Sequence, residues 1–337
     1  MAVTMKKIAE AQGVSIATVS RVLSGSEDSV SDEVRRSIVE TAKRLGYEPR
    51  KKIGRTVAFL IDTEMFNLSS LFYTNIISAA EKEVAARKFF FQFSAISSSE
   101  IPLNRLNLKF NDLAGVVIVG TYDREFLIRL RTQRIPVILL DYAVPTEDID
   151  AILVDNVDGI MKAGKHLAEL GHTRVAYISG TIDGLSAQER RHGFNLARAA
   201  YGFIEEPDLV EECPESMSGG FEAMQRILGR RDARRPTAVI AYNDMVAIGA
   251  MDAIKQQGLV IPGDMSIVGF DDLSLSAEVM PPLTTVQVPK ELMGKLAVET
   301  LFQAISGKSH FTRKILLPTM LVVRESTAAP NINGIDR

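Results

Sequence analysis

The chain has 337 residues, of which 46% are hydrophobic and 24% are charged, and its formal net charge is −3. This composition is typical of a folded globular protein and excludes an intrinsically disordered chain and a collagen-like fibre. The apolar runs are shorter than the roughly 18 residues of a membrane-spanning helix, and the single cysteine, Cys213, excludes an internal disulfide and a cysteine-cluster zinc site.

Positive charge is concentrated at the N-terminus. Residues 1–55 contain 11 Lys/Arg and 7 Asp/Glu, a net charge of +4, whereas the remaining 282 residues contain 28 and 35, a net charge of −7. A small basic unit on a larger acidic body suggests a polyanion-binding unit joined to a separate sensor or catalytic body. A solvated charged helix would produce the same charge pattern.

The first 48 residues are expected to form three short helices. Thr4 is positioned to cap the first, and Ser15 to cap a second over 16–23 after a three-residue turn. Ser31 is positioned to cap the third. Helix, tight turn and helix are typical of a DNA-binding helix-turn-helix unit. The apolar stripe expected on the third helix is Val34, Ile38, Ala42 and Leu45.

The exposed side of the second helix carries mostly short side chains, which would let its backbone approach the base pairs closely. Arg21 at the far end is long enough to reach a guanine or a phosphate. A three-helix cap without a ligand is the alternative explanation of this pattern. The surface consists of Ile16, Ala17, Thr18, Ser20 and Arg21, and we add Thr4, Ser15, Ser29, Ser31 and Tyr47 to the expected DNA-binding set.

These features resemble a known family. Residues 3–23 (VTMKKIAEAQGVSIATVSRVL) closely resemble the headpiece of the LacI/GalR (lactose/galactose repressor) family, most specifically in the turn 13–15 and in 17–23. The sequence LGYEP at 45–49 ends the headpiece as it ends in that family. The resemblance implies sequence-specific DNA binding.

From Thr56 onward, short apolar runs alternate with amphipathic stretches. This alternation predicts parallel sheets covered by helices on both faces, in a segment long enough for two lobes that enclose a ligand at the carboxyl ends of their strands. The expected strands are 57–61, 89–95, 115–119, 136–141, 174–179, 237–241, 266–270 and 284–288. The expected helices are 71–87, 156–170, 186–200, 219–229, 243–257 and 290–306.

Polar side chains follow several of these strands. Carboxylates, an amide and a guanidinium suit a polyhydroxylated ligand because each makes paired hydrogen bonds with adjacent hydroxyls. Phe72 and Tyr73 are placed to cover the apolar face of a sugar. Asp and Asn at strand ends also cap helices, an alternative that applies most to Asn243, where a helix begins. The expected ligand-binding residues are Asp62, Phe72, Tyr73, Asp141, Arg190, Asn243 and Asp271.

The body resembles the effector-binding core of the same family, so that the resemblance spans residues 3–328. Matching stretches include 165–172, 190–194 and 269–272. The resemblance implies an α/β fold with a helix-turn-helix headpiece and a two-lobed core like that of periplasmic binding proteins. It also implies that the effector pocket is lined by Asp141, Arg190, Asn243 and Asp271, with an aromatic ring from Phe72 or Tyr73.

Two features depart from the family pattern. Sugar-responsive members often place a tryptophan late in the core where this chain has Glu215, and this chain contains no tryptophan. Typical members also have a longer linker, which forms a hinge helix and wedges a leucine into the minor groove. Here only six residues separate Pro49 from the first strand, as in a branch with a shortened linker. We expect Arg50, Lys51, Lys52 and Arg55 to contact phosphates or the edge of the minor groove, without a sharp DNA bend.

The expected organisation has four parts. Residues 1–48 form the DNA-binding domain, 49–55 a short basic linker, 56–328 the effector-binding core and 329–337 a disordered tail. Within the core, lobe 1 is expected to contain 56–153 and 289–317. Lobe 2 is expected to contain 154–288 and 318–328.

The resulting hypothesis is a homodimeric repressor whose affinity for an inverted-repeat operator is controlled by a small sugar or sugar derivative between the lobes. Dimerisation is expected because one headpiece reads too few base pairs for useful specificity. The N-terminus lacks the apolar stretch of a signal peptide, so we expect a cytoplasmic protein. The alternatives are a solute-binding protein, a purine sensor and a sugar-modifying enzyme, although no phosphate-binding glycine loop or nucleophile elbow supports an enzyme. No cofactor, metal or membrane partner is expected.

Overall fold

The computed structural model describes residues 4–23, 30–47, 54–63, 71–96, 110–120, 124–144, 148–181, 184–230, 235–307 and 311–331. The chain divides into two compact units, residues 1–53 and 54–337. Among the described helices, none is both long and apolar enough to cross a membrane.

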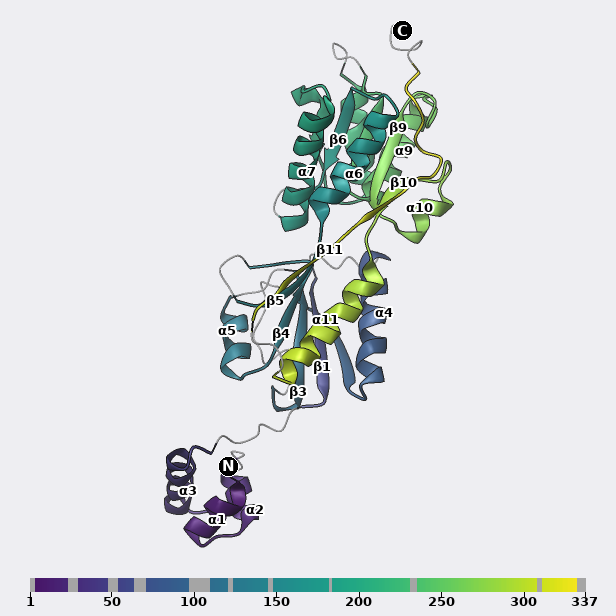
Figure 1. Ribbon diagram of the computed structural model, residues 1–337. Coiled ribbons are helices and arrows are strands. Elements are labelled where there is room, and N and C mark those ends of the chain that lie inside the picture. The colour runs from purple at the N-terminus through teal and green to yellow at the C-terminus, as the bar shows by residue number, and fades with distance from the viewer. Residues whose placement is uncertain are drawn as a thin grey trace. The chain divides into compact units, whose positions relative to one another are not determined.

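The described part of the smaller unit forms three helices around an apolar core (Figure 1). Ile8, Val19 and Ile38, one from each helix, are fully buried there. The chain turns sharply after the first helix at Gly13, whose φ of +63° lies in the left-handed region that glycine adopts without strain. The helices are α1 (Met5–Gln12), α2 (Ile16–Leu23) and α3 (Asp32–Arg44).

Helix capping follows the sequence expectation at one of three places. Ser15 Oγ accepts a hydrogen bond from the backbone N–H of Thr18 at 3.0 Å, so Ser15 caps α2 as expected. Thr4 and Ser31 occupy the N-cap positions of α1 and α3, but neither side chain makes a capping hydrogen bond. The expected side-chain caps at these two positions are therefore wrong.

Polar contacts and a tyrosine hold α3 in place. Ser37 Oγ donates to Gln12 Oε1 at 2.7 Å, and Gln12 Nε2 donates to Thr41 Oγ1 at 2.7 Å. Leu45, expected in the apolar stripe of α3, is 37% exposed because the helix ends at Arg44. Tyr47 packs against the core of this unit instead.

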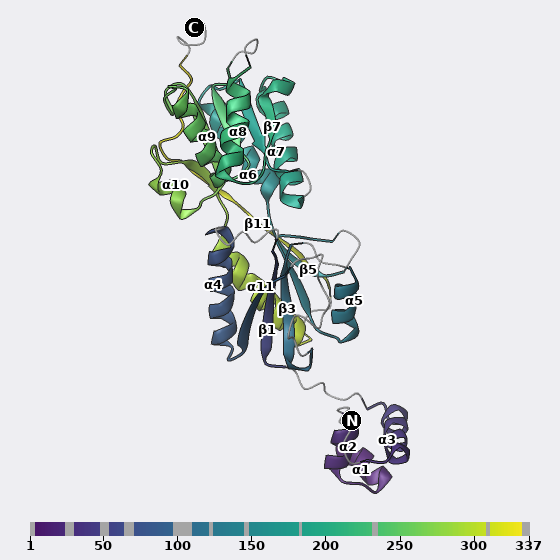
Figure 2. The ribbon, with the colours of Figure 1, turned by 180° about the vertical axis from the view of Figure 1, so that it is seen from behind.

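The described residues of the larger unit form two six-stranded sheets (Figure 2). Every strand pairing is parallel except that of β12 with β10. The first sheet has the order β11-β5-β4-β3-β1-β2, with β1 (Thr56–Asp62), β2 (Phe90–Ile96), β3 (Leu113–Val119), β4 (Val137–Leu140), β5 (Asp150–Val154) and β11 (Lys314–Leu317). The second has the order β12-β10-β9-β8-β6-β7, with β6 (Val175–Ser179), β7 (Val210–Glu212), β8 (Ala238–Ala241), β9 (Ser266–Asp271), β10 (Thr284–Gln287) and β12 (Met320–Val322).

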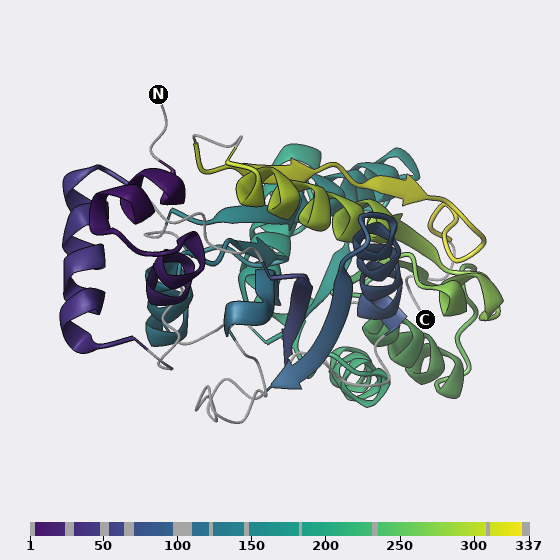
Figure 3. The same ribbon diagram turned by 90° about the horizontal axis from the view of Figure 1, so that it is seen from below.

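Helices cover both faces of each sheet. Successive side chains of a strand point to opposite faces, so a strand that is apolar throughout needs a helix on each face. In β1, Phe59 packs into the cluster that contains residues of α4 and α11, whereas Leu60 faces the cluster that contains α5. Figures 1 and 3 show α4 and α11 side by side. The helices are α4 (Leu71–Ala86), α5 (Arg124–Thr132), α6 (Asn156–Glu169), α7 (Leu185–Tyr201), α8 (Met217–Leu228), α9 (Asp244–Gln256), α10 (Ser274–Glu278) and α11 (Lys290–Ile305), with short 3-10 turns η3 (Phe110–Asp112) and η4 (Pro207–Leu209).

The chain passes between the two sheets three times. It leaves the first sheet after β5, returns after β10 and leaves again after β11 to reach β12 (Figure 1). Each lobe is thus assembled from separate segments of the sequence. The expected α/β architecture with parallel sheets is confirmed.

The C-terminal segment is held on the second lobe. His172 is buried, which lowers its pKa, and its Nε2 bonds the carbonyl of Ala328 at 2.9 Å. Pro330 lies against Gly171. Ordered contacts thus extend into the first residues of the expected disordered tail, of which 332–337 lie outside the described residues.

Candidate functional site

Four of the expected ligand-binding residues lie near the carboxyl ends of strands from both sheets. Asp141 follows β4 and Tyr73 lies in α4, whereas Arg190 lies in α7 and Asp271 ends β9. The Tyr73 hydroxyl donates to Asp141 Oδ2 at 3.3 Å, and Arg190 Nη2 donates to Asp271 Oδ1 at 3.3 Å. The charges of Arg190 and Asp271 both act on the pKa of Asp141, which connects the two pairs across the lobes.

Arg190 is the most constrained side chain of this cluster and is only 5% exposed. Its Nε donates to Asn156 Oδ1 at 2.9 Å and its Nη1 to the carbonyl of Tyr242 at 2.8 Å. The guanidinium lies 3.8 Å from the ring centroid of Phe270 and 4.7 Å from that of Tyr242. With the bond to Asp271, three of its five N–H donors are used within the protein.

Asp141 has an unusual backbone and an unusual pKa. Its φ of +57° is in the left-handed region, which few residues other than glycine adopt. Burial raises the pKa of Asp141 to about 7, although Arg190 opposes this shift. Burial, together with the charge of Asp141, raises the pKa of Tyr73 well above its usual value, so Tyr73 stays a hydrogen-bond donor.

A strained turn positions Asp271. Asp271 and the next residue, Asp272, have φ values of +108° and +51°. The ammonium of Lys290 donates to the carbonyls of both, at 3.0 Å for Asp272. Arg324 Nη2 and Gln287 Nε2 hold the Asp272 carboxylate at 2.6 and 2.7 Å. Burial raises the pKa of Asp271, while Arg190 and Lys290 oppose the shift.

Asp62 and Phe72, two further residues expected to bind the ligand, are mostly buried. Asp62 ends β1 and is 2% exposed, and Phe72 meets Tyr73 edge to face with 5.0 Å between the ring centroids. The ammonium of Lys290 lies 5.9 Å from the Phe72 ring centroid. Their expected ligand contacts remain predictions.

Asn243 caps a helix, the alternative to ligand binding that its position suggested. Its Oδ1 accepts the N–H of Val246 at 2.9 Å and so caps α9. The neighbouring Asp244 is fully buried, where it accepts the N–H of Leu273 at 2.7 Å and bonds two hydroxyls, those of Ser276 and Thr285. Asp244 is thus part of the scaffold, and a ligand contact from Asn243 remains a prediction.

Sequence analysis missed several residues of this cluster. Asn156 and Tyr242 follow β5 and β8, and the same strand-end rule would have found them. Glu215 lies in the loop between β7 and α8, and β7 is not among the strands expected from the sequence. A Cβ built on Gly180 would lie 3.1 Å from both Glu215 Oε1 and the Tyr242 ring, so these groups meet over this glycine. The charge of Glu215 contributes to the raised pKa values of Tyr73, Tyr242 and Asp271.

The expected DNA-binding surface lies on α2 of the smaller unit. Val19 and Val22 point into its core, whereas Ile16 is 50% exposed. Ser15, Ala17 and Arg21 are exposed, and Thr18 and Ser20 are half-buried. Elsewhere in this unit, Thr4 and Ser31 are exposed and Tyr47 is half-buried; Ser29, Arg50, Lys51 and Lys52 lie outside the described residues.

The last two residues of the expected linker, Gly54 and Arg55, pack on the first lobe. Gly54 is buried so closely against the backbone of Asp112 that a Cβ would lie 2.1 Å from it. Arg55 Nη2 donates to the carbonyl of Lys88 at 2.9 Å, and its guanidinium lies 6.0 Å from the Phe90 ring centroid. Arg55 therefore packs on the first lobe, and its proposed DNA contact would require it to leave these partners.

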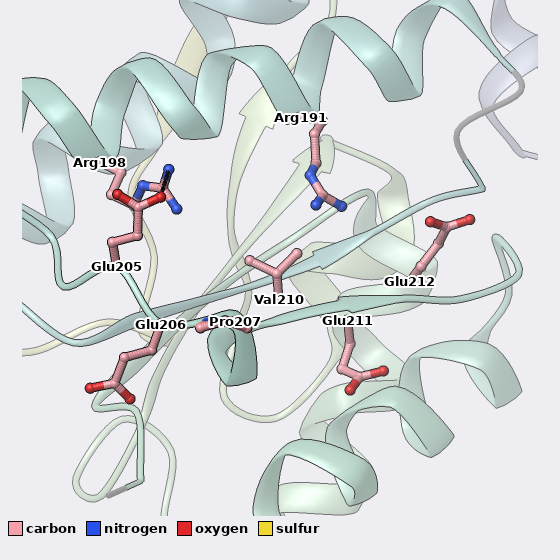
Figure 4. Close-up of a pocket in the computed structure, with 8 residues that line it drawn as sticks. All are labelled: Arg191, Arg198, Glu205, Glu206, Pro207, Val210, Glu211 and Glu212. Atoms are coloured by element: carbon pink, nitrogen blue, oxygen red, sulfur yellow. Dashed lines mark ion pairs between the residues drawn. The ribbon is translucent and has the colours of Figure 1, made fainter. Parts of the chain in front are cut away.

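A separate hollow of about 400 Å³ lies between α7 and the edge strand β7 (Figure 4). Arg191 points into it from α7, opposite Val210. Arg198 pairs with Glu205 at 2.7 Å. None of the expected ligand-binding residues lines this hollow. Its lining consists of Arg191, Arg198, Glu205, Glu206, Pro207, Val210, Glu211 and Glu212.

Neither the cluster nor the hollow forms a metal site. Within the described part of the chain, no group of three or more His, Cys, Asp or Glu side chains is arranged to hold a metal ion. The cluster around Arg190 instead offers hydrogen-bond acceptors, a guanidinium and aromatic rings, which suit a polar organic ligand.

Comparison with known proteins supports a regulator. The model of "Bacterial regulatory proteins, lacI family" matches residues 4–50, and that of "Periplasmic binding protein-like domain" matches 165–327. The chain is 30% identical to the HTH-type transcriptional regulator DegA of Bacillus subtilis (strain 168), over 98% of this chain and 100% of DegA. It is 29% identical to the HTH-type transcriptional repressor PurR of Aliivibrio fischeri (strain MJ11), over 96% and 98% of the two chains.

Two solved structures resemble the whole chain. The complex of the transcriptional regulator CelR with cellobiose superposes with a TM-score of 0.73 at 30% identity, covering 96% of this chain and 99% of CelR. The Lac repressor dimer bound to operator and the anti-inducer ONPF superposes with a TM-score of 0.71 at 27% identity, covering 98% and 100% of the two chains.

Proposed function

Because this chain belongs to the LacI family of DNA-binding transcriptional regulators, we propose that it represses transcription as a homodimer controlled by a small sugar bound between its lobes. The proteins it resembles are regulators and not enzymes. The proposed role places the protein in the cytoplasm with the chromosome.

One observation carries the proposed effector site. Tyr73, Asp141, Arg190 and Asp271 come from four elements and two lobes, yet they are joined by hydrogen bonds or by their mutual electrostatic effects. A ligand held by residues of both lobes couples its binding to the lobe arrangement, because it binds one arrangement better than another. The similarity to a regulator crystallised with cellobiose favours a sugar as that ligand.

The DNA-binding half of the proposal rests on α2. Its exposed face carries Ile16, Ala17 and Arg21, and the short side chain of Ala17 would let the helix backbone approach a major groove closely. Two headpieces related by two-fold symmetry would read the two halves of an inverted repeat. The likeness to a repressor dimer on its operator supports this arrangement.

A purine is the second candidate effector, favoured by the similarity to PurR. A flat base needs an accessible aromatic face. In this cluster the guanidinium of Arg190 lies over Phe270 and Tyr242, and the ammonium of Lys290 approaches Phe72. This use of the rings by the protein's own cations favours the sugar.

Selection of duplex DNA from a random pool by the full-length protein tests the proposal. We expect enrichment of an inverted repeat, and loss of enrichment in Arg21→Ala, whose change lies on the exposed face of α2. The selected operator then serves as the probe for a screen of sugars and purines. Enrichment by Arg21→Ala equal to that of the unaltered protein would contradict the assigned DNA surface. Release by a purine alone would replace the sugar.

A further inference from the structure

The chain enters the larger unit through a very close backbone contact. Gly54 is buried, and a Cβ built on it would lie 2.1 Å from both the carbonyl carbon and the carbonyl oxygen of Asp112 and 2.5 Å from the carbonyl carbon of Leu113. A side chain at this position would overlap these backbone atoms, so the contact requires glycine. The chain therefore passes directly against the backbone where η3 ends and β3 begins.

The next residue ties the chain to the edge strand β2 on the other side. The carbonyl of Arg55 accepts the N–H of Phe90 at 2.7 Å, which extends the pairing of β1 with β2 to the residue before Thr56. Arg55 Nη2 donates to the carbonyl of Lys88 at 2.9 Å, and the guanidinium lies 6.0 Å from the Phe90 ring centroid. We call residues 54–55 the anchor segment, since it has partners in two neighbouring parts of the first lobe.

The anchor segment limits how far a headpiece can reach from its own core. Tyr47 packs in the smaller unit, so six residues, 48–53, separate it from Gly54. Six residues span at most about 20 Å when fully extended. Two binding modules that are joined by a short connection bind together only where that connection spans both of their sites. Release of the anchor segment would lengthen the connection by about 7 Å in each protomer.

From these contacts we propose that Gly54, supported by Arg55, is a specificity-determining residue that fixes the spacing of the two operator half-sites. The inference rests on the proposed homodimeric repressor. It assigns the guanidinium of Arg55 to the core, in place of the DNA contact expected from its charge. A dimer with both anchor segments seated is restricted to a narrow range of spacings, whereas a dimer with released anchor segments accepts a wider range.

Two variants with the same chemical change test the anchor segment in the full-length chain. Gly54→Ala places a methyl group against the backbone of Asp112, so the segment must move. Gly263→Ala is the matched control, because Gly263 is exposed and a Cβ there would lie 3.5 Å or more from its neighbours, an ordinary contact distance. Arg55→Ala is a second test variant, which removes the bond to Lys88 without crowding Gly54.

The DNA probes are the selected inverted repeat and derivatives with base pairs added between its half-sites. Two added base pairs move the half-sites about 7 Å apart and rotate them by about 70°. We expect the affinity of the unaltered protein and of Gly263→Ala, measured by gel shift, to fall about tenfold or more on this addition. In Gly54→Ala and Arg55→Ala the fall should be about threefold or less.

Two further measurements separate an anchor from a DNA contact and from a general loss of stability. Loss of one phosphate contact lowers the slope of log affinity against log salt concentration by about 0.9. Arg55→Ala should leave this slope unchanged. Hydrogen exchange of the free protein at the N–H of Phe90, whose acceptor is the Arg55 carbonyl, should become faster in Gly54→Ala and remain unchanged in Gly263→Ala.

Three results would overturn the inference. The first is a spacing preference as narrow in Gly54→Ala as in Gly263→Ala. The second is a lower salt slope in Arg55→Ala, which would assign Arg55 to the DNA. The third is an exchange rate at Phe90 that Gly54→Ala leaves unchanged. Failure of the proposed function is a different result, since the unaltered protein would then enrich no inverted repeat, and the exchange measurement still decides whether Gly54 holds the anchor segment.

Discussion

At the scale of single residues, Asp141 and Asp244 have similarly raised pKa values but different hydrogen-bond partners. Burial raises the pKa of both from 3.8 to about 7. Asp244 accepts hydrogen bonds from Leu273, Ser276 and Thr285, so its carboxylate is used entirely by the scaffold. Asp141 is bonded only to Tyr73 within the described residues, so its other carboxylate oxygen has no protein donor among them.

Effector affinity should depend on pH through Asp141. Ligand hydroxyls that donate to Asp141 favour its ionised form, and about half of that form is lost at pH 7. We expect the affinity to fall about tenfold from pH 8 to pH 6, as calorimetric titration would measure. Asp141→Asn should bind more weakly and show no such slope. A slope that persists in this variant would assign the titration to another group.

Asp244 should make the fold less stable at alkaline pH. Its pKa is higher in the folded protein than in the unfolded chain, so its protonated form stabilises the fold. That contribution is complete below about pH 4 and is lost as the pH rises through about 7. We expect melting temperatures to fall from pH 5 to pH 8 less steeply in Asp244→Asn than in the unaltered protein. Equal slopes would refute this role of Asp244.

At the scale of secondary structure, sequence alone locates most elements of the core. The runs at 57–61 and 115–119 are apolar throughout because both faces of these strands are covered, and they appear as β1 and β3. Four strands were not expected from the sequence: β5, β7, β11 and β12. Of these, β7 has the sequence VEE and depends on pairing with β6, which no local pattern reveals. The missed α10 has five residues, too few for a hydrophobic period.

The residues of the candidate site that follow expected strands can be predicted from the sequence, whereas those positioned by loops and tertiary contacts cannot. Asp141, Arg190 and Asp271 were selected because they follow or flank recognisable strands, and the structure brings their side chains together. Glu215 was not assigned, since its place beside Tyr242 is set by the path of a loop between β7 and α8. The engagement of Lys290 with a turn nineteen residues away is likewise a tertiary contact.

The turn that follows β9 should depend on the start of α11. Lys290→Met removes two hydrogen bonds to the carbonyls of Asp271 and Asp272, two residues with left-handed backbones. We expect a loss of about 2 kcal/mol in the free energy of unfolding, measured with urea. Lys295→Met on the same helix is the control. Among the described residues Lys295 makes a single ion pair, with Glu299 near the surface, so its loss should cost less than about 0.5 kcal/mol. Equal losses would contradict this role of Lys290.

The three headpiece helices should differ in their dependence on capping side chains. Ser15→Ala removes the bond to the N–H of Thr18 and should destabilise the headpiece by about 1 kcal/mol. Ser31→Ala should cost only a few tenths, since Ser31 makes no capping bond. Circular dichroism during thermal unfolding measures both. A larger loss in Ser31→Ala than in Ser15→Ala would contradict the observed caps.

At the scale of the whole molecule, the connection between the two units is short. Tyr47 packs in the smaller unit and Gly54 packs against Asp112 in the larger, so only residues 48–53 join them. These six residues extend at most about 20 Å as an open chain and about 9 Å as a helix. A separate hinge helix that wedges a side chain between base pairs has little room here.

Operator DNA should therefore remain close to straight. A circular-permutation gel-shift assay with the selected operator should show mobilities that depend weakly on the position of the site. Replacing the central base step of the operator should also have little effect, since no side chain is expected to be inserted there. A sharp bend centred on that step would contradict the predicted role of the linker.

The three crossings between the lobes have a consequence for how such proteins can be recombined. A single break near residue 53 separates the headpiece from the core, so one crossover exchanges the entire DNA-reading module. Exchange of one lobe would need three matched breaks, after β5, after β10 and after β11. One crossover can therefore combine a new headpiece with an existing core, whereas the two lobes of the core are inherited together.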